Sequence, residues 1–135
     1  MEVVLMYKNK LLISEDKHDI VEVIASNGCE ISCDNKPMKE LVANSTDAAQ
    51  EKHVPQVSVE DNKIKVVVGS VEHPMLEAHY ITNIWVEYSD GTVDRAGLVP
   101  GMKPEYVFDL KGRTGKVTVY EYCNLHGLWK NEIEL

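Results

Sequence analysis

A chain of 135 residues with a net charge of −8 at pH 7 has room for one ordinary domain, or for one domain and a small appendage. Its hydrophobic content of 44% and charged content of 27% are typical of a folded globular protein and exclude a disordered chain. The excess of acidic residues argues against nucleic acid or an anionic membrane as a partner, and no apolar run approaches the roughly 20 residues that span a bilayer.

The N-terminal segment and the cysteines point to a cytoplasmic protein. Glu2 is acidic, and residues 1–8 carry neither a basic region nor a small-residue cleavage site, so we expect no signal peptide. Three cysteines, Cys29, Cys33 and Cys123, are an odd number that does not suit a disulfide framework. We therefore expect reduced thiols, each free to pack as a small hydrophobic side chain or to bind a metal.

Residues 1–44 have the pattern of a small β-rich domain. Short apolar runs rich in Val and Ile alternate with polar turns. The runs of strand length are Val3–Met6, Lys10–Ile13, Ile20–Ile24 and Glu30–Cys33. A piece of this size has little core of its own, so we expect it to pack against a second domain or a partner subunit.

A linker with one turn of helix is predicted at residues 45–52. Ser45 or Thr46 is the expected N-cap, with Asp47 near the positive end of the helix dipole. Pro55 cannot continue a helix, so the helical turn has to end before it.

From Val54 onward the pattern predicts strands. The clearest are Val57–Val59, Ile64–Val68, Tyr80–Tyr88, Tyr106–Leu110 and Lys116–Tyr122. Turn signals separate them, the strongest being Asp90-Gly91. Short strands at about 8–12-residue spacing indicate an antiparallel sandwich. The chain is therefore predicted to be all-β, with a small domain at residues 1–44 and an immunoglobulin-like β-sandwich at residues 45–135.

Five side chains form a candidate set of metal ligands. Cys123 and His126 stand two residues apart on a turn closed by a glycine, and His53, His73 and His79 lie in loops that a sandwich can bring to the same end. Taken singly, a loop histidine is usually solvated and a free cysteine is usually packed in a core. Taken together, imidazoles and one thiolate suit iron, copper or zinc.

The number of donors separates these metals. Structural zinc takes four ligands and usually more cysteine, and type 1 copper takes two histidines, a cysteine and a weak axial methionine. His79, Cys123 and His126 suit copper, but no methionine follows Met102. A five-coordinate iron with one open position accommodates all five donors. Two alternatives stay open: a copper or iron electron-transfer protein without catalysis, and a recognition module in which the histidines are incidental.

Four segments resemble the motifs of desulfoferrodoxins, the superoxide reductases. They are Glu51–Pro55, Gly69–Met75, His79–Ile81 and Glu121–Trp129. They follow one another in the order of the family, and the resemblance runs from about residue 19 to residue 129, over most of the chain. It implies an oxidoreductase that reduces superoxide to hydrogen peroxide with one electron and two protons, without releasing oxygen.

The resemblance also implies the arrangement of the site. His53, His73, His79 and His126 would bind a ferrous iron in the equatorial plane, with Cys123 axial and the opposite position open to superoxide.

Lys52 and Glu51 have roles implied by the same resemblance. Lys52 would be a cation beside the open position, and Glu51 a carboxylate able to bind the oxidised iron. An acidic protein repels an anionic substrate at long range, so a local cation is needed to attract it. Rubredoxin or a similar small carrier is the expected electron donor, and a homodimer is expected.

Some members of this family hold a second iron in the N-terminal domain, bound by four cysteines as Cys-x-x-Cys and Cys-Cys. In this chain Ser14 and Lys17 stand at the first pair, and Cys33 and Asp34 at the second. Cys29 lies nearby, but two thiolates do not complete a site of four. This desulforedoxin-like domain is therefore expected to be metal-free and structural.

Overall fold

The structure is a computed structural model that describes residues 10–135, so the predicted strand Val3–Met6 lies outside the described residues. The chain divides into two compact units between Val42 and Ala43. Strands dominate both, and every pairing is antiparallel, which confirms the prediction of an all-β chain. No helix within residues 10–135 has the length and apolar character needed to cross a membrane.

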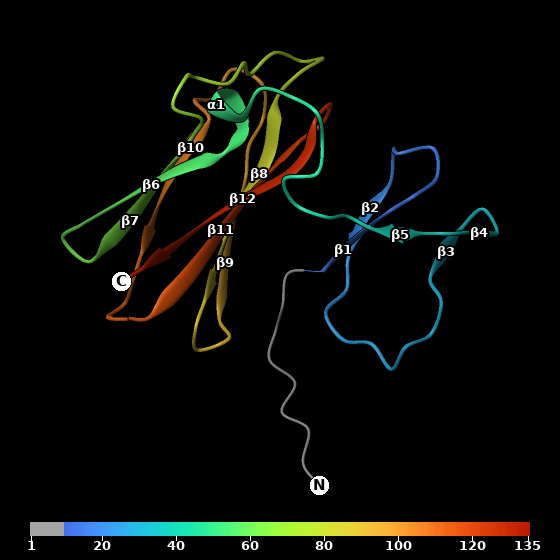
Figure 1. Ribbon diagram of the computed structural model, residues 1–135, viewed down its shortest axis with the longest axis horizontal. Helices are drawn as coiled ribbons and strands as arrows, with labels where there is room; N and C mark the ends of the chain where they lie inside the picture. The colour runs from blue at the N-terminus through green and yellow to red at the C-terminus, as the bar shows by residue number, and fades with distance from the viewer. Residues whose placement is uncertain (1–9) are drawn as a thin grey trace, which may run out of the picture. The chain divides into compact units, whose positions relative to one another are not determined.

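The first unit contains five short strands in two small sheets (Figure 1). They are β1 (Leu11–Ile13), β2 (Ile20–Glu22), β3 (Ser32–Cys33), β4 (Lys36–Pro37) and β5 (Lys39–Glu40). β1 pairs with β2 and β5, and β3 pairs with β4. The three predicted runs that fall within the described residues contain β1, β2 and β3. Two-residue strands carry no alternation, so β4 and β5 left no signal in the sequence.

The second unit opens with α1 (Gln50–His53), a single helical turn. Its N-cap is Ala49, whose side chain makes no capping hydrogen bond. The predicted cap at Ser45 or Thr46 is therefore wrong, because the helix begins further along the chain than the capping signal indicated. The helix ends directly before β6, which starts at Pro55, as the missing proline N–H requires.

Two sheets form the β-sandwich of the second unit (Figure 1). The strands are β6 (Pro55–Glu60), β7 (Lys63–Val68), β8 (Ile81–Tyr88), β9 (Val93–Gly97), β10 (Glu105–Asp109), β11 (Lys116–Cys123) and β12 (Gly127–Glu134). One sheet has the order β10-β7-β6 and the other β12-β11-β8-β9. The chain changes sheets after β7, after β9 and after β10, as in an immunoglobulin-like Greek key.

The core lies between these sheets and consists largely of β-branched side chains. Residues without exposed surface include Ile64, Val66, Val68, Ile84, Val86, Val117 and Val119. They alternate along β7, β8 and β11 with residues that point away from the core, as a two-residue strand period requires. Burying each such side chain contributes about 1.5–3 kcal/mol relative to leaving it exposed. The sandwich is therefore a firm support for the loops at its two ends.

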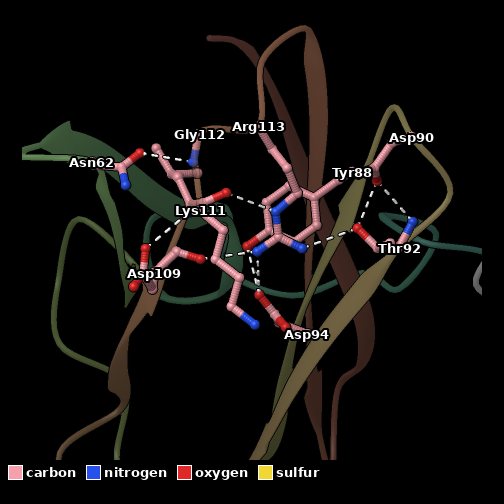
Figure 2. Close-up of polar contacts among 10 residues, drawn as sticks. Asn62, Tyr88, Asp90, Thr92, Asp94, Asp109, Lys111, Gly112 and Arg113 are labelled. Atoms are coloured by element: carbon pink, nitrogen blue, oxygen red, sulfur yellow. Dashed lines mark hydrogen bonds and ion pairs between the residues drawn. The ribbon is translucent and has the colours of Figure 1, made fainter.

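The first end carries α1, the loop between β7 and β8, and the turn between β11 and β12 (Figure 1). The opposite end carries the β6–β7, β8–β9 and β10–β11 turns. Arg113 connects the last two of these turns, as Figure 2 shows. Its guanidinium donates hydrogen bonds to Asp94 Oδ2 (2.9 Å), Thr92 Oγ1 (2.9 Å), the Asp109 carbonyl (2.9 Å) and the Leu110 carbonyl (2.7 Å).

The same guanidinium lies 3.5 Å from the centroid of the Tyr88 ring, and the Tyr88 hydroxyl donates to Asp94 Oδ2 at 2.8 Å. Asn62, from the β6–β7 turn, accepts a hydrogen bond from the Gly112 N–H at 3.1 Å (Figure 2). All three turns of this end are thereby held together by polar contacts, and the chemistry-bearing side chains gather at the other end.

Candidate metal centre

The first end of the sandwich brings together all five candidate ligands predicted from the sequence. Their donor atoms lie within 4.8 Å of one another. The residues are His53, His73, His79, Cys123 and His126. They come from α1, the β7–β8 loop, the end of β11 and the β11–β12 turn, so residues far apart in the sequence meet at one point.

The four imidazoles stand at the corners of a square. Going around the square, the rings follow in the order His53, His73, His79, His126. The centroids of neighbouring rings are 4.7, 4.7 and 4.9 Å apart in that order, and those of His126 and His53 are 4.8 Å apart. Their planes are nearly perpendicular, at 73°, 81°, 81° and 88°. Cys123 Sγ is 3.4 Å from His73 Nε2 and 3.9 Å from His126 Nδ1. The sulfur therefore lies outside the centre of the square and leaves that point free.

Hydrogen bonds to backbone carbonyls fix the tautomers of two histidines. His53 Nδ1 lies 2.7 Å from the Ala49 oxygen and His73 Nδ1 lies 2.7 Å from the Pro74 oxygen. A carbonyl oxygen only accepts, so each Nδ1 carries the proton and each Nε2 presents a lone pair. The two Nε2 atoms nevertheless face each other at 3.2 Å. Two lone pairs attract no proton between them, but they suit a shared cation.

The distances test whether a metal fits. His53 Nε2 is 3.2 Å from His73 Nε2 and 3.1 Å from His126 Nδ1. A square with these edges has its centre about 2.2 Å from each corner, close to the ~2.0–2.1 Å of a metal–imidazole bond. His79 Nε2 is buried and finds no hydrogen-bond partner within residues 10–135. The donor set therefore fits a metal ion.

Burial keeps these rings in the form that a metal needs. It lowers the pKa of His73 to about 4 and also lowers the pKa of His53 and of His79. The neighbouring imidazoles act in the same direction. Neutral rings at neutral pH leave their lone pairs free for coordination, so these three histidines can bind a metal without first losing an extra proton.

Cys123 ends β11 and has no exposed surface. The register between β11 and β8 shifts between Tyr122 and Cys123, a bulge that redirects the strand end. Burial raises the pKa of the thiol, while the backbone amides of Leu125 and His126 donate to the sulfur and lower it. These amides stabilise a thiolate, which a bound metal cation would favour further.

Glu51 and Lys52, the two predicted catalytic residues, lie on α1 directly before His53, and both side chains are exposed. The Lys52 charge contributes to lowering the pKa of His53 and His79, so the ammonium is near these rings. Glu51 contacts its surroundings through its backbone carbonyl, which accepts hydrogen bonds from the Val71 N–H at 2.9 Å and the Ser70 hydroxyl at 3.3 Å.

Trp129 and Gly69 stood inside the quoted motifs without an assigned role, and the structure gives each one. Trp129 is 2% exposed, stacks on His53 with centroids 5.0 Å apart, and donates Nε1–H to the His126 carbonyl at 3.0 Å. Gly69 has φ +82°, and a Cβ there would lie 2.6 Å from the Glu51 oxygen. In the sequence, the position of Gly69 at the end of a predicted strand and before the loop that carries His73 could have indicated this role.

Glu121 is a site residue that the sequence analysis missed. It has no exposed surface, and neither carboxyl oxygen has a hydrogen-bond partner among the described residues. Burial raises its pKa well above the usual range and so favours the protonated carboxyl. The signal was the alternation Val117, Val119, Glu121, Cys123, which points the carboxyl into the core beside the thiol.

Comparisons with known proteins agree on one family. A family model for desulfoferrodoxin matches residues 45–132. The desulfoferrodoxin of Clostridium acetobutylicum is 44% identical over 124 residues, which cover 91% of this chain and 95% of that protein. The crystal structure of the superoxide reductase from Treponema pallidum superposes with a TM-score of 0.70 at 31% identity, covering 90% of this chain and 98% of that one. The superoxide reductase of Giardia intestinalis, of the 1Fe type, gives a TM-score of 0.54 at 31% identity, covering 63% and 99%.

Proposed function

This chain belongs to the desulfoferrodoxin family, and we propose that it is a superoxide reductase with one iron bound by His53, His73, His79, His126 and Cys123. The observation that carries the proposal is the square of imidazoles whose ring nitrogens face one point beside a buried thiol. Relatives named superoxide reductase share this fold over nearly their whole length.

The proposed reaction combines one superoxide, one electron and two protons to give one hydrogen peroxide. Iron bound by these donors supplies the one-electron redox chemistry, which zinc does not offer. All four rings surround one point, which favours this proposal over an electron-transfer protein that uses only His79, Cys123 and His126.

Lys52 is proposed to attract the substrate. The chain carries a net charge of −8, which repels superoxide at long range. A single ammonium whose charge is felt at His53 and His79 reverses that field locally. Glu51, exposed on the same helical turn, is proposed to supply a carboxylate to the oxidised iron.

The surroundings of Cys123 are proposed to set how strongly the thiolate donates electron density. The amides of Leu125 and His126 withdraw density from the sulfur, as hydrogen bonds to a ligating thiolate do. Burial of Cys123, His53 and His73 keeps bulk water from this side of the site.

The electron donor is proposed to be rubredoxin or a similar small carrier. The N-terminal unit carries only Cys29 and Cys33 of the four cysteines that a second iron of this family requires, so we propose that this desulforedoxin-like unit is metal-free and that electrons arrive from outside. A homodimer in the cytoplasm completes the proposal.

An iron count combined with a visible spectrum of the oxidised protein tests the function. The expected result is one iron per chain and a thiolate-to-ferric charge-transfer band that disappears in Cys123→Ser. Superoxide should be consumed with formation of peroxide and without release of oxygen. Release of oxygen at half the rate of superoxide loss would indicate dismutation and refute the proposal. A metal content and spectrum unchanged by His53→Ala would refute the five-ligand site, and a rubredoxin-type spectrum would refute a metal-free N-terminal unit.

A further inference from the structure

Asn124, directly after Cys123, makes three hydrogen bonds to the loop that carries His79. Its side-chain Oδ1 accepts from the Tyr80 N–H at 2.9 Å, and its Nδ2 donates to the Ala78 carbonyl at 3.1 Å. Its own backbone N–H donates to the Tyr80 carbonyl at 3.2 Å. One side chain therefore holds the residue before His79 and the residue after it.

His79, which is half-buried, differs from the buried rings of His53 and His73 in how it is held. His53 and His73 each donate Nδ1–H to a backbone carbonyl, which fixes the orientation of the ring. The structure shows no such bond from the His79 ring within residues 10–135, and its Nε2 has no partner there. Besides its edge contacts with the rings of His73 and His126, the position of this ring therefore depends on the backbone that carries it.

That backbone is held at every residue from 78 to 80. His79 itself pairs with Leu76 through two backbone hydrogen bonds of 2.9 Å, which close a tight turn. Asn124 holds the two flanking residues. Only a short planar amide places one acceptor and one donor at these two backbone groups, since the Tyr80 N–H requires an acceptor and the Ala78 carbonyl requires a donor.

We propose that Asn124 is the positioning residue of His79, and that through it the thiolate of Cys123 and the imidazole of His79 are placed as one unit. The inference rests on the proposed metal site. Asn124 acts through backbone groups and is not itself a ligand. Its loss is expected to free the His79 turn while leaving Cys123, at the end of a core strand, in place.

The test uses Co²⁺ as the probe in the full chain and measures the rate of metal release to a chelator. Asn124→Ala should release Co²⁺ about tenfold faster than the wild type, the scale seen when supporting contacts of a metal ligand are removed. The thiolate-to-cobalt charge-transfer band should persist, because Cys123 stays bound. Asn124→Asp keeps an acceptor for the Tyr80 N–H, so its release rate should lie between those of the wild type and Asn124→Ala. This variant also tests the inference if Asn124→Ala folds poorly.

A double-mutant cycle separates positioning from a general structural role. In a His79→Ala background, adding Asn124→Ala should not speed release further. Asn62→Ala is the matched control, since this asparagine bonds Gly112 at the opposite end of the sandwich; it should lower stability without changing the release rate.

Three results would overturn the inference. An unchanged release rate in Asn124→Ala, or the same acceleration with and without His79, would refute it and leave the metal site standing. Failure of the wild type to bind Co²⁺ would refute both this inference and the proposed function.

Discussion

Replacing Gly69 with alanine should displace α1 and with it His53. Gly69 directly follows β7 and has φ +82°, and an added Cβ would lie 2.6 Å from the Glu51 oxygen and 2.8 Å from the Lys52 carbonyl carbon. Both are backbone atoms of α1, and the Val71 backbone oxygen lies closer still, so no flexible side chain can move aside. The loop after Gly69 and the helical turn both have to shift, and the ligand at the last residue of the turn shifts with it.

The structure gives the size of this effect. Ordinary contact begins at 3.4 Å, so the Glu51 carbonyl has to move by about 0.8 Å, the difference between 3.4 and 2.6 Å. A left-handed alanine costs about 1–2 kcal/mol, and the overlap adds about 1–3 kcal/mol. Because metal–ligand distances tolerate only about 0.2 Å, we expect iron affinity to fall by about 10–100-fold, the scale of lost supporting contacts.

Gly112→Ala is the matched control for Gly69→Ala. Gly112 also has a positive φ, +74°, but a Cβ there meets nothing within 4 Å. It should lose only the ~1–2 kcal/mol of backbone strain and keep a full iron site. Unfolding in urea and iron retention against a chelator measure both quantities. If Gly69→Ala retains iron like the wild type and unfolds like Gly112→Ala, the tight approach of α1 to β7 does not position His53.

Four further outcomes are expected. Lys52→Ala should slow the reaction with superoxide by on the order of tenfold at low salt and weaken the dependence of its rate on ionic strength. The same change at the exposed Lys63, at the opposite end of the sandwich, should leave the rate unchanged. Stopped-flow mixing measures both, and a Lys52 variant as fast as the wild type would contradict the steering role. Arg113→Ala should lower the free energy of unfolding by about 1–3 kcal/mol in urea titrations, since it removes the ion pair to the partly exposed Asp94 and the hydrogen bonds to Thr92 and two carbonyls, with iron content unchanged. Burial raises the pKa of Glu121, so between the unfolded and folded pKa values the folded state binds a proton that the unfolded state has lost. The free energy of unfolding should therefore fall as pH rises through that window. Glu121→Gln should remove this pH dependence from urea titrations of the protein without metal, and a pH dependence that persists would mean that another group causes it. Trp129→Phe keeps the stacking on His53 but loses the hydrogen bond to the His126 carbonyl. It should speed the release of iron to a chelator by a few-fold. A release rate equal to that of the wild type would mean that this hydrogen bond does not hold the β11–β12 turn.

The sequence predicted which side chains gather at the site but not how each ring faces it. His53, His73 and His79 direct Nε2 inward, whereas His126 directs Nδ1. The choice depends on the chain path: His126 lies only three residues from Cys123 on a turn, so the nearer ring nitrogen reaches the centre. The carbonyls of Ala49 and Pro74 fix two of the other rings, and such backbone contacts leave no mark in a sequence.

The strands that were predicted are those whose apolar side chains alternate into the core. β7 and β11 have this pattern, but β9 has a single buried residue, Ala96, and β12 mixes Lys130, Asn131 and Glu132 with apolar neighbours. Both were missed because β-strand formation there depends on pairing with a neighbour, which no local pattern records. The helix cap failed for a similar reason: α1 is held by hydrogen bonds from Val71 and Ser70 to Glu51, not by its own capping residue.

The donor atoms of the candidate site are held around one point by the packing of the sandwich. Lone pairs of His53 and His73 face each other at 3.2 Å, and the Glu121 carboxyl is buried without a partner among the described residues. Cys123 ends a strand whose preceding inward residues, Val117 and Val119, are fully buried. The opposite end of the sandwich is closed by the Arg113 contacts. Packing elsewhere in the sandwich therefore determines where these groups lie, and the proposed metal would bind donors whose positions the fold sets.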